Sequence, residues 1–337
     1  MPVLLSSPEP TTPTRPPEPP APLPPVEVWR YDEHFPGLDA VEWTGWNGQT
    51  YQLWCATPHD LHSGVVLGRR VRGLHYGGME EWTSESPAID GASYLGYRAT
   101  PREVFLNLRV FKHTSSQEWV DYDRAFWRSM LPALPGVRGP GRLTVTQPNG
   151  DRRWLELYPT HKGDHEYETD PTRTGWASYG QYLTAYRPFW TGPALPARTF
   201  QAGGSSGFFG GVAGGKGAPF VIGSSATFGQ AVIDNPGDEY AWPVWRLFGP
   251  FDTAKIGVAG QLSEITVPVS AGDHLVIDTD PLAQTVVDST GAQRVSTQIS
   301  GAPFAPVPPG QAVPLVAEMV GAGRIEVSLQ PRYWRAW

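Results

Sequence analysis

The sequence contains a single cysteine, Cys55, in 337 residues. One thiol cannot form an intrachain disulfide or a zinc site built from several thiolates. Cys55 also lies in the apolar run YQLWCA (51–56), which favours a buried structural thiol over a reactive nucleophile. The fold must therefore be stable without disulfide bonds.

Long apolar runs and strong positive charge are also missing. No stretch approaches the roughly 20 consecutive apolar residues that a membrane span requires, and the N-terminus lacks the basic and apolar segments of a secretory signal. The formal net charge is −7, and the densest basic cluster is the short GRRVRG at 68–73. Because proteins that wrap nucleic acid need an extended basic surface, we expect neither a membrane-bound nor a nucleic-acid-wrapping protein.

Catalytic motifs are equally sparse. The segment GGVAGGKG (210–217) comes close to a phosphate-binding loop, but Gly217 stands where Ser or Thr would ligate Mg²⁺, and no hydrophobic strand precedes it. The sequence also lacks the nucleophile elbow of serine hydrolases. We therefore expect no catalytic residues and no bound cofactor, and we predict that the protein is not an enzyme.

Two short segments carry residue types that bind metals. The first is the loop at 160–175, which contains His161, Asp164, His165 and Asp170. The second is HDLH at 59–62. In the first segment, Gly163 and the flanking prolines favour a solvated loop over a helix with both histidines on one face. We predict a metal site at neither segment.

Glycine and proline, in contrast, are abundant, with 38 and 36 residues. Such a composition favours short strands joined by tight turns over long helices, so we predict a mainly β protein. Many of the prolines fall in residues 1–25, MPVLLSSPEPTTPTRPPEPPAPLPP. Because proline fixes φ and removes a backbone donor, this segment is predicted to be an extended polyproline II or disordered arm.

The pattern after the arm predicts a β domain with one helix over residues 26–192. Its clearest strand is REVFLNLRVFK (102–112), because alternate apolar residues share one face: Val104, Leu106, Leu108 and Val110. The helix spans about 116–131, with Ser115 or Ser116 as its cap. Its apolar residues recur at helical spacing, namely Trp119, Tyr122, Phe126 and Met130. A hairpin follows at 142–158, and Asn149-Gly150 predicts a primed turn at its tip.

Residues 193–337 predict an antiparallel β-sandwich. Short apolar strands recur about every eight to twelve residues with turn signals between them, as is typical of sandwiches. The first of these strands is ATFGQAVID (226–234) and the last is RIEVSLQ (324–330). The sequence shows no fixed-period repeat.

The stretch NPGDEYAWPVWRLFGP (235–250) combines a turn with an aromatic strand. We predict a type II turn with Pro236 second and Gly237 third, where φ must be positive. Pro243 then marks an edge or a bulge, because proline cannot donate to a ladder. The alternation predicts a core face formed by Tyr240, Trp242 and Val244. It leaves Trp245 on the opposite face as a possible carbohydrate contact.

The order of these segments resembles that of siphophage distal tail proteins, of the type usually labelled minor tail proteins in actinobacteriophages. The resemblance covers residues 26–337 and rests on REVFLNLRVFK, the single helix, QPNGDRRWLELY, YLTAYRPFW, NPGDEYAWPVWRLFGP, DHLVIDT and the terminal PRYWRAW. Its most specific part is the spacing of GD, AWP and G in 235–250, followed by L-x-IDT.

This resemblance implies an N-terminal β-barrel-like domain that closes into a homohexameric ring, followed by a galectin-like antiparallel β-sandwich. It also implies a non-catalytic baseplate hub at the distal end of the virion tail, made in the host cytoplasm. The expected partners are other copies of the chain, the tail tube protein, the tape measure protein and the baseplate hub or tail-tip proteins. DNA would be only a passing cargo, and no membrane is involved.

The residues also leave other functions open. Fourteen tryptophans would suit a carbohydrate-binding module for recognition of the host cell wall. A hydrolase within the first domain is a more distant alternative.

Overall fold

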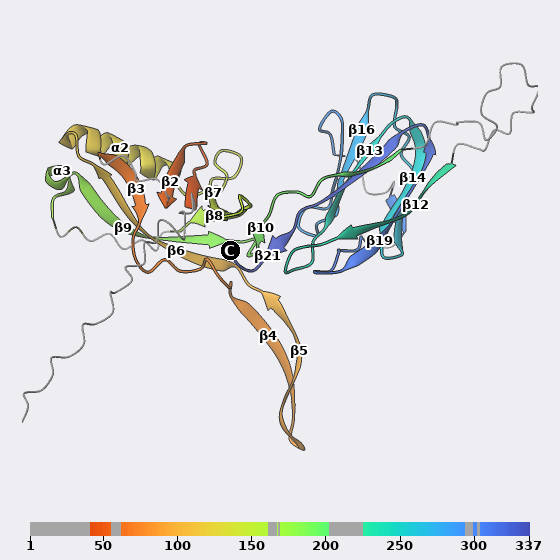
Figure 1. Ribbon diagram of the computed structural model, residues 1–337, viewed down its shortest axis with the longest axis horizontal. Coiled ribbons are helices and arrows are strands. Elements are labelled where there is room, and N and C mark those ends of the chain that lie inside the picture. Colours follow the sequence, from red (N-terminus) through yellow and green to blue (C-terminus); the bar gives the residue numbers. More distant parts are fainter. Residues whose placement is uncertain are drawn as a thin grey trace, which may run out of the picture. The chain divides into compact units, whose positions relative to one another are not determined.

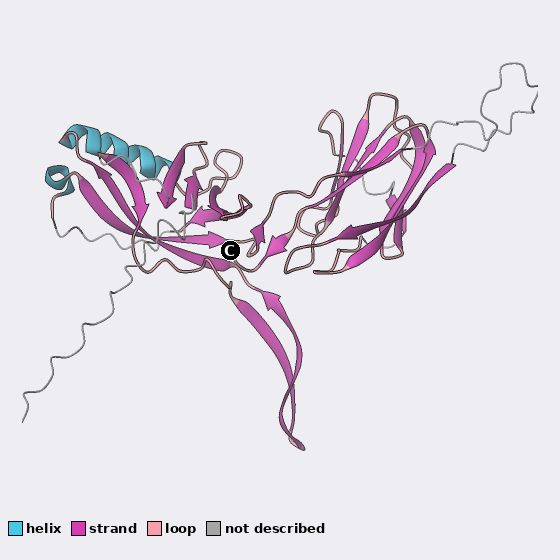
Figure 2. Cartoon of the chain, in the orientation of Figure 1, coloured by secondary structure: helices cyan, strands magenta, loops and turns pink. Residues whose placement is uncertain are grey.

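The computed structural model describes residues 41–54, 62–160, 167, 169–201, 225–293, 299–301 and 304–337. The proline-rich arm, Cys55 and the segment 210–217 lie outside these residues. The described chain is mainly β, as predicted, with two helices (Figure 2). Within it, no helix has the length and apolar character needed to cross a membrane.

The first sheet contains nine antiparallel strands (Figure 1). Its main path runs in the order β2-β1-β7-β8-β9-β6-β3, and the two end strands approach each other to give a nearly closed, barrel-like sheet. Two short strands extend it, since β10 pairs with both β8 and β21. The strands are β1 (Val41–Thr44), β2 (Thr50–Trp54), β3 (Ser63–Leu67), β6 (Arg102–Lys112), β7 (Gly141–Thr146), β8 (Arg152–Pro159), β9 (Trp176–Ala185), β10 (Trp190–Thr191) and β21 (Arg332–Tyr333).

The predicted helix and the strand predicted at 102–112 are confirmed. Helix α2 spans Ser116–Ser129, and the Ser115 hydroxyl accepts a hydrogen bond from the Glu118 amide at 3.2 Å, as an N-cap does. The helix buries Trp119 and Phe126 among the residues that fill the first sheet, and the alternate residues of β6 lie in the same core: Val104, Leu106, Leu108 and Val110. A second, one-turn helix, α3 (Pro171–Thr174), is capped by Asp170.

The hairpin between β7 and β8 has a different turn from the one predicted. Gly150 has φ of +88°, but Asn149 is not among the residues with positive φ, so the primed turn is wrong. The Gly150 amide instead donates to the Gln147 carbonyl at 2.9 Å, and the Gln147 amide donates to Asp151 at 2.7 Å. The Asn149 side chain accepts from the Asp151 amide at 3.0 Å, which stabilises Asn149 without a left-handed backbone.

Two further five-stranded antiparallel sheets share one hydrophobic core, as the sandwich prediction requires. The first has the order β11-β20-β13-β16-β17 and the second the order β12-β19-β14-β15-β18. Their strands are β11 (Arg198–Gln201), β12 (Ser225–Asp234), β13 (Pro243–Phe248), β14 (Phe251–Val258), β15 (Gln261–Ile265), β16 (His274–Asp278), β17 (Thr285–Asp288), β18 (Ile299–Gly301), β19 (Ala312–Gly321) and β20 (Arg324–Leu329). The sequence pattern predicts neither β11 nor β14.

The end of the chain returns to the first sheet. Strand β21 pairs with β10, and Ala336 is fully buried in the core of the first sheet. We therefore propose that residues 332–337 belong with the first domain, and the division of the chain near 192 stays a proposal.

The face assignment around Trp245 is wrong. Tyr240 is 52% exposed, whereas Trp245 is only 1% exposed and lies in the sandwich core. The inward positions of β13 are the odd ones, since Trp245 lies opposite Ile277 and Val327, which are buried as well. A shift of one residue exchanges the two faces of a strand.

The turn before this strand also differs from the prediction. Gly237 has no positive φ, so the turn is not type II. Glycine is needed there for another reason, since a Cβ on Gly237 would lie 2.6 Å from the Arg332 carbonyl oxygen. Pro243 is the first residue of β13, a strand with neighbours on both sides rather than at an edge. A missing amide is tolerated at the start of a strand.

Close packing in the first core leads to a testable prediction at Gly141. A Cβ on Gly141 would lie 2.2 Å from the ring of Trp43, which is fully buried. We expect Gly141→Ala to lower the free energy of unfolding by about 1–3 kcal/mol through overpacking. Denaturant unfolding followed by circular dichroism measures the change.

Gly139→Ala is the matched control, because its added Cβ meets no atom within 4 Å. Equal stability of the two variants would contradict the packing described for Trp43.

Candidate assembly surface

Among the described strands, β4 (Met79–Ser86) and β5 (Ile89–Ala99) pair only with each other, and they form a two-stranded ribbon (Figure 1). Every residue of β4 is exposed. The large apolar side chains of the ribbon are exposed as well: Met79 44%, Trp82 46%, Tyr94 59%, Leu95 67% and Tyr97 40%. A two-stranded ribbon in water is marginally stable by itself, and a contiguous exposed apolar surface usually marks an interaction site.

The two faces of the ribbon differ in chemistry. Because opposed residues share a face, Tyr97 and Tyr94 lie with their partners Glu81 and Thr83, and Trp82 lies on the other face. The side chains of 79–99 carry four acidic groups and one Arg, so their net charge is 1 − 4 = −3. The ribbon therefore combines aromatic surface with negative charge, and a partner would need apolar surface and positive charge.

Arg102 holds together the segments at the base of the ribbon. Its side chain is fully buried at the start of β6, and it donates hydrogen bonds to four backbone carbonyls. The acceptors are Gly73 (3.0 Å), His75 (2.5 Å), Pro188 (2.6 Å) and Trp334 (2.8 Å). Burial lowers the pKa of Arg102 to about 10, so the guanidinium is still charged at neutral pH.

An aromatic cluster lies beside this guanidinium and includes a residue of the ribbon. The ring centroid of Trp334 is 4.8 Å from Phe189, 5.7 Å from Tyr97 and 6.0 Å from Tyr76. The Tyr97 hydroxyl donates to Glu239, and burial together with this bond raises the pKa of Tyr97 to about 12. The C-terminal segment is thus in direct contact with the base of the ribbon.

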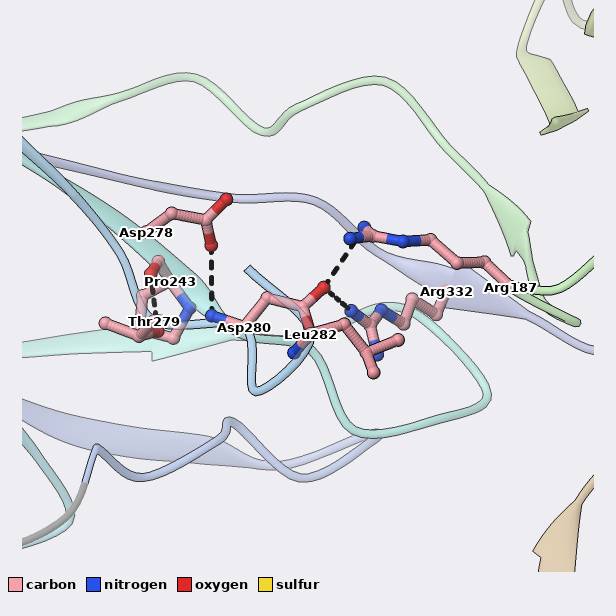
Figure 3. A network of polar contacts seen from close by, with 7 residues as sticks. All are labelled: Arg187, Pro243, Asp278, Thr279, Asp280, Leu282 and Arg332. Carbon is pink, nitrogen blue, oxygen red and sulfur yellow. Dashed lines mark hydrogen bonds and ion pairs between the residues drawn. The ribbon is translucent and has the colours of Figure 1, made fainter. Parts of the chain in front are cut away.

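A second polar network surrounds Asp280 (Figure 3). Its carboxylate is 9% exposed and accepts from Arg332 at 2.6 Å and from Arg187 at 3.3 Å. Its other oxygen accepts from the Leu282 amide at 3.0 Å, and the adjacent Thr279 hydroxyl donates to the Pro243 carbonyl at 2.6 Å. The network therefore joins the β16–β17 connection to β21 and to the β9–β10 connection.

The structure gives no common site for the residues singled out in the sequence. His161, Asp164 and His165 lie outside the described residues, whereas Asp170 caps α3 and accepts from the Thr172 amide at 3.0 Å. Burial of Trp245 leaves no ring face accessible to a sugar. Across the described chain, no three His, Cys, Asp or Glu side chains gather as metal ligands would.

The comparisons with known proteins concern the fold. No family model matches the sequence, and no curated protein is detectably similar to it. The Dit (gp 19.1) protein of SPP1, described as a paradigm of the hub adsorption apparatus in Gram-positive infecting phages, is similar with a TM-score of 0.56 and 10% identity, over 87% of this chain and 98% of that chain.

Two structures of the phage P2 baseplate in its activated conformation are also similar. The form with Ca has a TM-score of 0.51 and 13% identity over 87% of this chain and 97% of that chain. The form with Sr has a TM-score of 0.51 and 14% identity over 86% and 97%. At these identities the likeness establishes that the fold is shared.

Because the Arg102 guanidinium makes four buried hydrogen bonds, we expect its removal to destabilise the fold strongly. Arg102→Met would leave four buried carbonyls without their donor, so we expect the free energy of unfolding to fall by about 3–5 kcal/mol. Denaturant unfolding of this variant and of the unmodified chain measures the loss of stability.

Arg98→Met is the control, because Arg98 is exposed and its pair with Glu80 should contribute at most about 1 kcal/mol. Equal losses in the two variants would show that Arg102 is not a central contact.

Proposed function

We propose that the chain is the structural hub of a long non-contractile phage tail. In this role six copies form a ring that joins the end of the tail tube to the baseplate or tail tip. The observation that carries the proposal is the β4–β5 ribbon, an exposed aromatic surface that needs a partner. Support also comes from the fold shared with phage hub and baseplate chains over nearly the whole of their length.

A closed ring requires a heterologous interface, in which one surface of a subunit meets a different surface of the next. The ribbon would be the first surface. The second would be the exposed basic segment 68–73, where Arg69, Arg70 and Arg72 oppose the net charge of −3 on the ribbon. Glu81 and Glu85 lie on the tyrosine-bearing face and would pair with these arginines.

The remaining parts of the proposal follow the hub role. The partners would be the tail tube protein, the tape measure protein and the baseplate hub or tail-tip proteins, at the distal end of a tail made in the host cytoplasm. DNA would pass through the ring, and an acidic chain of net charge −7 suits a conduit that DNA must not adhere to. A strongly basic lumen would contradict this last point. The galectin-like nature of the sandwich and a non-catalytic role are further parts of the proposal.

Removal of the ribbon's apolar side chains should prevent assembly. Each large aromatic at an interface centre can contribute about 2 kcal/mol or more, so the triple change Trp82→Ser, Tyr94→Ser and Leu95→Ser should weaken association by at least about 100-fold. Mass photometry and sedimentation velocity of the purified full chain measure the distribution between monomer and hexamer. A control variant carries Tyr240→Ser and Leu282→Ser, which remove exposed apolar side chains from the second part of the chain.

Charge reversal tests the proposed pairing of the two surfaces. Glu81→Arg with Glu85→Arg should dissociate the ring, and so should Arg69→Glu with Arg70→Glu. The combined variant should recover assembly, because opposite charges face each other again. If the triple serine variant still forms hexamers, the proposed role of the ribbon is wrong. If the unmodified chain remains monomeric, the proposed ring is wrong.

The alternative function is a carbohydrate-binding module that uses an exposed tryptophan after residue 192. The tryptophan singled out for this role, Trp245, is buried and so gives no support to that function.

A further inference from the structure

A groove of about 460 Å³ opens on the outer surface of the first sheet, over β1, β7 and β8. Its lining includes two indole rings, Trp46 and Trp154, and three charged side chains, Glu42, Arg142 and Arg152. Thr44 and Thr144 add hydroxyl groups. The hub role uses none of these residues, and they come from the sheet rather than from the ribbon.

The two indoles are held in place by the protein. The Trp46 ring is 36% exposed, and its N–H donates to the Arg128 carbonyl at 2.7 Å, which fixes the ring orientation. Trp154 lies on β8 beside Thr144 of β7 and Thr191 of β10, and it is partly exposed. The guanidinium carbon of Arg142 lies over the Trp154 ring at 5.3 Å from its centroid, and that of Arg138 lies over the Trp46 ring at 5.8 Å, so a ligand would stack on the ring area beside these groups. Fixed aromatic rings with an accessible face can stack on a ligand at little entropic cost.

The charged groups leave an excess positive charge in the groove. Glu42 is already satisfied, because it accepts from Gln52 at 2.9 Å and from Arg152 at 3.3 Å. Arg142 takes part in no ion pair among the described residues, although Glu156 is its cross-strand neighbour. Two arginines against one glutamate give a net charge of 2 − 1 = +1 in the groove of a chain whose net charge is −7.

We propose that this groove binds an acidic saccharide, a sugar unit that carries a carboxylate or phosphate group. The apolar face of the sugar ring would lie on Trp154 or Trp46, as amphipathic ligands lie on aromatic side chains. Arg142 would bind the anionic group through two parallel N–H donors. The Thr44 hydroxyl, which is bonded to Thr50 at 3.3 Å, and the remaining lone pairs of Glu42 would exchange hydrogen bonds with sugar hydroxyls, which can both donate and accept. This site does not depend on the proposed hub role.

A proline-rich peptide is the competing ligand, because aromatic-lined grooves also bind polyproline II segments. The polar lining favours the saccharide. A proline-rich segment has few N–H donors to offer the polar lining of the groove, whereas a sugar presents hydroxyl groups around its whole rim. The unneutralised Arg142 further selects an anionic ligand over a neutral one.

Isothermal titration calorimetry with the full chain tests the site directly. The probes are a glucuronate-containing disaccharide, the neutral disaccharide chitobiose, inorganic phosphate, and a peptide with the sequence of residues 8–25. We expect the acidic disaccharide to bind most tightly. Trp154→Ala should weaken binding of both saccharides by about tenfold or more, and Trp154→Phe should retain much of it. Arg142→Gln should weaken only the acidic one, by about tenfold.

Tyr240→Ala is the matched control, because it removes an exposed aromatic ring away from the groove and should change neither affinity. Thermal unfolding of each variant confirms that it is folded. The proposal is overturned if neither disaccharide binds at millimolar concentration, or if binding survives both Trp154→Ala and Arg142→Gln. Phosphate that binds as tightly as the acidic disaccharide would show an anion site only, and preferential binding of the peptide would assign the groove to polypeptide.

Discussion

The buried guanidinium of Arg102 is the contact on which the arrangement around the barrel-like sheet depends. A charged side chain without solvent exposure is costly unless its donors are satisfied, and here four carbonyls from three distant segments accept from four of its five N–H groups. Those segments are the connection before the ribbon, the connection between β9 and β10, and the C-terminal residues. Each must come to Arg102 for the fold to be stable, so one side chain determines where all three lie. No hydrophobic residue could impose this requirement, because dispersion contacts do not select individual carbonyls.

The ribbon and the C-terminal segment depend on this arrangement. Arg102 follows β5 by only a few residues, so the ribbon leaves the barrel-like sheet directly beside the anchored guanidinium. Trp334 accepts one of the four hydrogen bonds through its carbonyl, and its ring packs on Tyr97 of the ribbon. Asp280 then binds Arg332, which connects the same C-terminal segment to the sandwich strands. An exposed aromatic ribbon on a rigid base is suited to contact another subunit, since little further ordering is needed on binding.

The sequence predicts correctly those strands and helices that are determined by residues close together in the chain. Strand β6 follows from four alternating apolar residues, and helix α2 from Ser115 and an apolar spacing of three to four. Other features depend on contacts between residues far apart in the chain. The predicted face of Trp245 is reversed because the pairing of β13 with the distant strands β16 and β20 decides which residues of the strand point inward. The sequence does not predict the β4–β5 ribbon. Both faces of the ribbon are exposed, so its residues lack the alternation of apolar and polar side chains that marks a half-buried strand. In the sequence, Arg102 looks like an ordinary charged residue at the start of a strand. Its four acceptors, at 73, 75, 188 and 334, are backbone carbonyls far away in the chain, so no residue near Arg102 indicates them.

The proposed hub role requires that the ribbon becomes buried between subunits of a ring. Cryo-electron microscopy of the purified full chain tests this most directly, because it gives both the symmetry and the position of β4 and β5. We expect a six-fold ring in which the ribbon of each subunit lies on the basic segment 68–73 of its neighbour. Isolated monomers, or a ring in which Trp82, Tyr94 and Leu95 all face solvent, would contradict it.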